Sequence, residues 1–176
     1  MRARKIIDEK NPGLSGDEKN YIAEKIGIGA VKYADLSQYR TTDYIFSWDK
    51  MLSLHGNTAP YLQNAYVRIR SIFRKAGEAP PKIDELIFSE PAELDLAKRV
   101  CQFAEIVQQV LTGFRPNILA TYLFELANSF HGFYEACPVL KSEEPARSSR
   151  LALCDLTARV LQRGLDLLGI KVPEKM

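Results

Sequence analysis

The sequence predicts a mainly α fold, a helical bundle preceded by a short N-terminal α(β) appendage. From Asn57 onward, apolar residues recur at helical spacing in several long stretches. Joins that contain proline or glycine separate these stretches, as in bundles with short connections. A single segment, TDYIFSW over residues 42–48, has the aromatic and β-branched composition of a strand. One strand needs partners, so this segment predicts a minor β element at most.

The first 56 residues are expected to form short helices. In order, we expect a helix that stops at residues 11–13, a helix from about 15 to 26, and a short helix over 30–36. Ser15 and Glu18 have the spacing of a capping box, which satisfies the free N–H groups where a helix begins. Gly27 and Gly29 are expected to break the chain between the second and third of these helices.

A long helix is expected to begin near residue 58 and to end before residues 79–81. Asn57 or Thr58 can act as its N-cap, and Pro60 suits its first turn. At about 100° per residue, one stripe of this helix is apolar and should face the core. That stripe contains Leu62, Tyr66, Ile69 and Phe73.

Three further helices should complete the bundle, over about residues 91–111, 117–137 and 146–168. The first should bury Leu94, Ala97, Cys101, Ala104 and Leu111, with Val100, Phe103 and Val107 widening this face. The second should bury Leu119, Tyr122, Leu123, Leu126, Phe130 and Phe133. The third should bury Leu151, Cys154, Ala158, Leu161, Leu165 and Leu168, with Gly169 in a C-cap role.

Composition excludes several classes of protein. Apolar residues make up 46% of the 176-residue chain and charged residues 26%, which are ordinary globular values. No stretch approaches the roughly 18 apolar residues of a membrane span, and the N-terminus does not resemble a secretory signal. Cys101, Cys137 and Cys154 are predicted to be reduced core thiols of a cytosolic protein. With two histidines and no CxxC pair, no metal site is expected.

A second stripe of the helix that begins near residue 58 is polar, and it carries the functional hypothesis. It contains Tyr61, Asn64, Arg68, Ser71 and Lys75. An aromatic ring can stack on a splayed base, an amide can read a base edge, and cations can meet phosphates. The pattern therefore suits single-stranded nucleic acid. The alternative is a solvated helix surface, which the net charge of +2 does not exclude.

Three blocks of the sequence resemble arginyl-tRNA synthetase of class I, in the order and spacing of that family. They are GIGAVKYADLSQYRTTDYIFSWDKML over residues 27–52, NTAPYLQNAYVRIRSIFRK over 57–75, and VLQRGLDLLGIKVPEKM over 160–176. The resemblance implies that residues 1–56 are the tail of the catalytic region, with a connection that contacts tRNA. It implies that residues 57–176 are a helical anticodon-binding domain.

The resemblance also implies an anticodon-binding site. In the family, the positions that match Tyr61, Asn64 and Arg68 contact the anticodon loop. Asn64 departs from the tyrosine that is usual there, so a stacking platform is replaced by a hydrogen-bonding side chain. The matching positions add Tyr134 and Met176, and the terminal methionine is expected to pack beside the anticodon bases. A core tyrosine and a frayed terminus are the structural alternatives for these two.

Arginine–tRNA ligation that uses ATP is the parent activity that the resemblance implies. In that family the ATP- and arginine-binding parts lie upstream of this segment, so the resemblance implies no cofactor in this chain and no catalysis by it alone. The sequence also has no GxxxxGK phosphate loop. The expected partners are arginine-accepting tRNA and an upstream catalytic domain, in a cytoplasmic monomer without membrane contact. A free-standing RNA-binding paralogue and a protein-interaction bundle remain as alternatives.

Other basic and histidine positions have less specific interpretations. His131 is expected to be a packed histidine, because it lies among apolar helix residues. Phosphate binding and ordinary solvation are both open for cations of the second and fourth bundle helices. These cations are Lys98, Arg99, Arg147, Arg150, Arg159 and Arg163.

Overall fold

The computed structural model describes residues 2–10 and 13–176, and within these ranges it contains helices and no strand. The helices are α1 (Arg2–Lys10), α2 (Gly16–Leu36), α3 (Trp48–Met51), α4 (Ala59–Ala76), α5 (Pro91–Cys101), α6 (Phe103–Gly113), α7 (Pro116–Ala136) and α8 (Ala146–Leu167). The prediction of a mainly helical protein is therefore confirmed. No helix in this part of the chain combines the length and apolarity needed to cross a bilayer.

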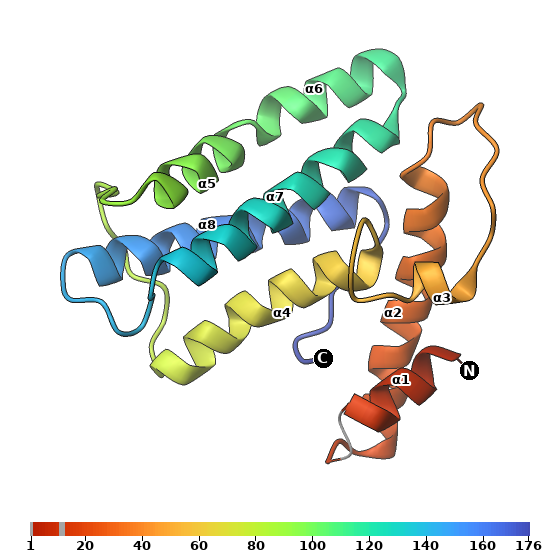
Figure 1. Ribbon diagram of the computed structural model, residues 1–176, viewed down its shortest axis with the longest axis horizontal. Helices are drawn as coiled ribbons and strands as arrows, with labels where there is room; N and C mark the ends of the chain where they lie inside the picture. The colour runs from red at the N-terminus through yellow and green to blue at the C-terminus, as the bar shows by residue number, and fades with distance from the viewer. Residues whose placement is uncertain (1, 11–12) are drawn as a thin grey trace.

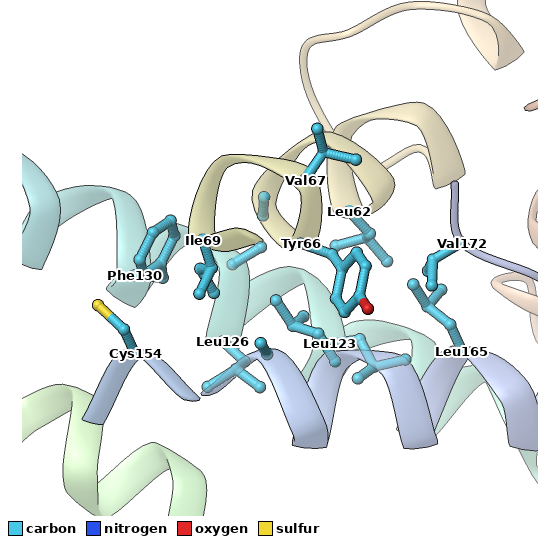
Figure 2. Close-up of a cluster of buried hydrophobic side chains, with 14 of the residues drawn as sticks. Leu62, Tyr66, Val67, Ile69, Leu123, Leu126, Phe130, Cys154, Leu165 and Val172 are labelled. Atoms are coloured by element: carbon cyan, nitrogen blue, oxygen red, sulfur yellow. The ribbon is translucent and has the colours of Figure 1, made fainter. Parts of the chain in front are cut away.

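Helices α4 to α8 form the bundle, and α7 packs against α4, α5, α6 and α8 (Figure 1). Figure 2 shows the centre of the core, where side chains of α4 meet those of α7 and α8. Every residue predicted to face inward on α4, α7 and α8 is buried. The 3.6-residue periodicity identified these three faces because each is apolar along its whole length.

The cap of α4 fixes where the polar stripe begins. The Thr58 side chain accepts a hydrogen bond from the N–H of Tyr61 (3.3 Å), and proline occupies the first turn. The helix ends at Gly77, whose φ of 69° is left-handed and therefore favours glycine. These signals place Tyr61 in the first turn of α4, with the rest of the polar stripe along one side of the helix.

The region predicted as one helix over 91–111 differs from the expectation. It is divided into α5 and α6 at Gln102, and its buried face overlaps the predicted one only in part. Ala97, Val100 and Phe103 pack against the core as predicted, whereas Ala104 is exposed. Leu94 and Leu111 are exposed, and Cys101 is an exposed thiol, whereas Cys137 and Cys154 are buried as predicted. The residues that face the core are Glu93, Leu96, Ala97, Val100, Phe103, Ile106 and Val110.

An ion pair explains why Glu93, and not Leu94, faces the core in α5. The Glu93 carboxylate accepts a hydrogen bond from Nε of Arg150 at 2.5 Å, and both residues are buried. Apolar periodicity assigns a charged residue such as Glu93 to the solvent side. The predicted core face of α5 was therefore centred on the wrong residues. Arg150, one of the candidate phosphate-binding arginines, is therefore a structural residue.

The N-terminal helices pack as a smaller unit against α4. The capping box of Ser15 and Glu18 is present at the start of α2, as predicted. The predicted break at Gly27–Gly29 is wrong, because α2 continues to Leu36. A Cβ atom on Gly29 would lie 3.0 Å from Nε2 of Gln63, so this glycine allows α2 to approach α4 closely. The predicted helix end at residues 11–13 falls partly outside the described residues.

The strand predicted over residues 42–48 is also wrong. Residues 42–47 are irregular and α3 starts at Trp48. Ile45 is 88% exposed, and Phe46 makes an edge-to-face contact with Trp48 at 4.8 Å between ring centroids. A strand needs a neighbour to pair its backbone groups, and the described residues contain no other strand. Strand propensity alone therefore did not predict the structure of residues 42–48 correctly.

Candidate nucleic-acid interface

The polar stripe of α4 borders a surface depression of about 690 Å³ between α4, α7 and the C-terminal tail. Four of the five predicted site residues line this depression, which we call the basic depression: Asn64 and Arg68 on α4, Tyr134 on α7 and Met176 at the end of the tail. Tyr61 lies beside it, one helical turn before Asn64. The fold thus brings together residues that are more than one hundred positions apart in sequence.

Positive charge dominates the lining of the basic depression. Glu135 has the one side-chain carboxylate among its described lining residues. The cations are Arg68, Arg74, Lys75, Lys141 and Lys175. A concave surface with such an excess of one sign attracts polyanions, although the net charge of the whole chain is only +2.

Arg68 is the best-placed cation of the basic depression. Its guanidinium carbon lies 5.5 Å from the centroid of the Tyr134 ring, which is a cation–π distance. Its Nη1 is 3.3 Å from Nδ1 of His131. None of the ion pairs among the described residues involves Arg68. The guanidinium is therefore held by neutral rings and keeps donors for a ligand.

The side chain of Tyr61 is held in place through its hydroxyl and through its ring. Its hydroxyl donates a hydrogen bond to Oδ1 of Asn128 (2.7 Å), and its ring centroid is 5.1 Å from that of His131. Burial raises the pKa of Tyr61, although Arg68 opposes this effect. Because the ring is half-buried and held in place, it offers a rigid surface for stacking at the rim of the basic depression.

The tail that carries Met176 is bound along its length. The backbone carbonyls of Gly169, Lys171, Val172 and Glu174 accept hydrogen bonds from Lys32, Gln63, Lys25 and Arg74, respectively. Gln63 is fully buried and also donates to the carbonyl of Lys25 at 3.2 Å. Gly169 has the predicted C-cap role, with a φ of 70° where the chain leaves α8. The tail ends beside α4 (Figure 1), where Met176 packs partly buried against the core.

Residues 62–176 match the family described as the DALR anticodon binding domain. The chain belongs to this family. Residues 1–48 match a second family, the catalytic domain of class I tRNA synthetases (R).

The relatives of this DALR-family chain are arginine–tRNA ligases. Those of Chromobacterium violaceum and Actinobacillus succinogenes are 53% and 51% identical to it over 99% of its length. Arginyl-tRNA synthetase of Thermus thermophilus has the same fold, with a TM-score of 0.92 and 37% identity over 99% of the chain. A Plasmodium falciparum structure gives 0.89 and 34%. The resemblance to arginyl-tRNA synthetase is thus confirmed, and the chain spans only 30–31% of each of these relatives.

Sequence reasoning missed Asn128 and Glu135 at this surface of the DALR domain, and it predicted His131 only as a packed histidine, which its ring contacts with Tyr61 and Phe130 confirm. Asn128, His131 and Glu135 occupy positions three and four apart on α7, so they form a polar stripe on a helix that is otherwise mostly apolar. That spacing was a usable signal. It indicates which α7 residues face the polar stripe of α4, but not which pairs touch.

The remaining basic candidates lie away from the basic depression. Arg147 pairs with Glu78 and Glu144, and Arg99 pairs with Glu125. Arg159 and Arg163 are exposed and line a different depression, with Lys25 and Lys171. The described residues contain no group of three or more His, Cys, Asp or Glu side chains suited to a metal ion.

Proposed function

We propose that residues 57–176 bind the anticodon loop of an arginine-accepting tRNA. The observation that supports this most is the basic depression, in which Arg68, Tyr134 and Met176 meet within a domain of the DALR anticodon-binding family. Its volume exceeds that of a single base, and its cations suit the phosphates that flank an unstacked base.

Each site residue has a distinct role in this proposal. Tyr61 and Tyr134 stack on bases of the opened loop, and each stacked base contributes roughly 1–3 kcal/mol. Asn64 hydrogen-bonds to a base edge. Arg68 contacts a base edge or a phosphate, and Met176 supplies an apolar wall beside the bases. A wrong base leaves polar groups of the protein unpaired, so binding of this kind selects among loops.

We further propose that the chain acts as the C-terminal part of a cytoplasmic, monomeric arginine–tRNA ligase. Residues 1–56 then form the end of its catalytic region, and their likeness to the class I catalytic domain supports this division. The described residues offer neither a phosphate loop nor a cluster of metal ligands for ATP. We assign the binding of ATP and arginine to the parts of the ligase beyond the 30–31% of its relatives that this chain spans.

The test is binding of a fluorescently labelled RNA hairpin that carries an arginine-tRNA anticodon loop, followed by anisotropy. We expect wild-type affinity to fall with salt, with a slope of log K against log[salt] of about −0.7 for each phosphate neutralised. Arg68→Ala should weaken binding by about 5- to 150-fold, the equivalent of roughly 1–3 kcal/mol for a well-placed arginine contact.

Lys98→Ala is the matched control, because it removes an exposed cation from α5 outside the basic depression. We expect its affinity to stay within about twofold of wild type, since a charge far from the ligand is screened by salt. Equal losses in both variants would mean that net charge and not the depression governs binding. No binding by the wild-type chain at low salt would favour a protein-interaction bundle instead.

A further inference from the structure

His131 connects two of the three candidate RNA-binding side chains of α4, Tyr61 and Arg68. It lies on α7 opposite Tyr61 and Arg68, with its ring 5.1 Å from the Tyr61 ring and its Nδ1 3.3 Å from Nη1 of Arg68. The ring of Phe130 supports it from the core at 5.6 Å. This arrangement gives a half-buried histidine a defined place and a single polar neighbour at Nδ1.

A hydrogen bond between Arg68 and Nδ1 requires one particular protonation state of His131. A guanidinium donates hydrogen bonds and cannot accept them, so Nδ1 must present its lone pair. The ring is then neutral, with its proton on Nε2. Burial lowers the pKa of His131, Arg68 lowers it further, and Glu135 on α7 opposes both. The side chain of Tyr61 also lies against the His131 ring, and its hydroxyl donates to Asn128.

We propose that His131 is a positioning residue for Arg68, which its Nδ1 holds over the Tyr134 ring so that the guanidinium is ordered before RNA binds. This inference rests on the proposed function. A free arginine loses rotamer freedom when a ligand immobilises it, and a side chain that is already held loses less. His131 therefore adds to affinity without touching the RNA.

Two substitutions of His131 distinguish the effect of its Nδ1 acceptor from the effect of its ring contacts. His131→Asn places an amide oxygen near the position of Nδ1 and does not titrate. His131→Phe keeps the contacts with Tyr61 and Phe130 but has no acceptor. With the labelled hairpin at pH 7.5, we expect His131→Phe to raise Kd about 2- to 12-fold, which corresponds to the freezing of one long side chain. His131→Asn should stay within about twofold of wild type, and far-ultraviolet circular dichroism checks that both variants fold.

A double-mutant cycle decides whether His131 acts through Arg68. In an Arg68→Ala background, His131→Phe should cause no further loss of RNA affinity, because there is no guanidinium left to hold. A purely structural role for His131 would give additive losses. If the wild-type protein binds the hairpin and the two losses add, the inference about His131 is overturned while the proposed function stands.

A measurement without RNA completes the test. The chain has two histidines, so comparison with His131→Asn assigns the His131 signal in a proton NMR titration. Arg68→Ala should raise the pKa of His131, because it removes the nearby positive charge. An unchanged pKa would show that Arg68 is not held at Nδ1 and would overturn the inference. Failure of the wild-type protein to bind the hairpin overturns the proposed function, and with it any role of His131 in RNA binding.

Discussion

Replacing Glu93 with alanine is expected to lower the free energy of unfolding by about 3–5 kcal/mol, because it leaves the buried Arg150 guanidinium without its counter-ion. Glu93 is 1% exposed and Arg150 is 8% exposed. The second carboxylate oxygen of Glu93 accepts hydrogen bonds from the N–H groups of Ser89 (2.6 Å) and Glu90 (2.9 Å). Arg150 also donates to the carbonyl of Pro138 and to Oγ of Ser142. Removal of Glu93 therefore leaves Nε of Arg150 and two backbone N–H groups without their acceptor.

Urea denaturation followed by circular dichroism measures this loss. The control is Glu125→Ala, which breaks the exposed pair with Arg99 and should cost less than about 1 kcal/mol. The double variant Glu93→Ala/Arg150→Met should be more stable than Glu93→Ala alone, because no buried charge remains. Equal losses for Glu93→Ala and Glu125→Ala would contradict the structural role of this ion pair.

The decrease in the free energy of unfolding at acidic pH should also depend on the ion pair between Glu93 and Arg150. Burial acts to raise the pKa of Glu93, but hydrogen bonds from Arg150, Glu90 and Ser89 outweigh it and hold the pKa below its ordinary value of 4.5. A carboxyl group whose pKa is lowered in the folded state stabilises the protein fully above its unfolded pKa. That contribution is lost as the pH falls through the folded pKa, so Glu93→Ala should flatten the loss of stability below about pH 4.5.

Phe130→Ala is expected to cost about 3–5 kcal/mol of stability and to weaken RNA binding as well. Phe130 is fully buried, and its ring centroid lies 5.6 Å from that of His131 and 6.0 Å from that of Tyr134. The cavity left by the phenyl ring removes support from both side chains. Figure 2 shows this ring at the core, next to Ile69 of α4.

Leu111→Ala is the control for this substitution, because Leu111 is 67% exposed on α6. Its unfolding free energy should change by no more than about 0.5 kcal/mol. Hairpin affinity is measured well below the melting temperature of each variant, so that the folded proteins are compared. Normal affinity in a folded Phe130→Ala protein would show that His131 and Tyr134 do not depend on Phe130 for their positions.

Where sequence reasoning succeeded, one physical signal dominated. The inward faces of α4, α7 and α8 followed from apolar periodicity, and the start of α4 from its cap and proline. The prediction failed at α5 because a buried ion pair places Glu93 on the core side. It failed at Gly29 because that glycine serves a close helix contact and not a helix end. Both depend on partners distant in sequence, which no local pattern contains.

The candidate interface was predictable to a similar degree. The polar stripe of α4 could be found from spacing, and the resemblance added Tyr134 and Met176 at its border. The contact between His131 and Arg68 could not be found, because it joins two helices whose relative rotation follows from the packed core. The anchored tail was equally hidden, since backbone carbonyls have no sequence signature.

Those tail contacts also imply an order of folding. The hydrogen bonds that hold the tail join positions separated by 100, 108, 137 and 147 residues. The entropy lost on closing a loop grows with its length, whereas a helix turn needs only its neighbours. We therefore expect the helices to form early and the tail to dock late. A molecule with all its helices in place still lacks one wall of its ligand-binding surface until this last step is complete.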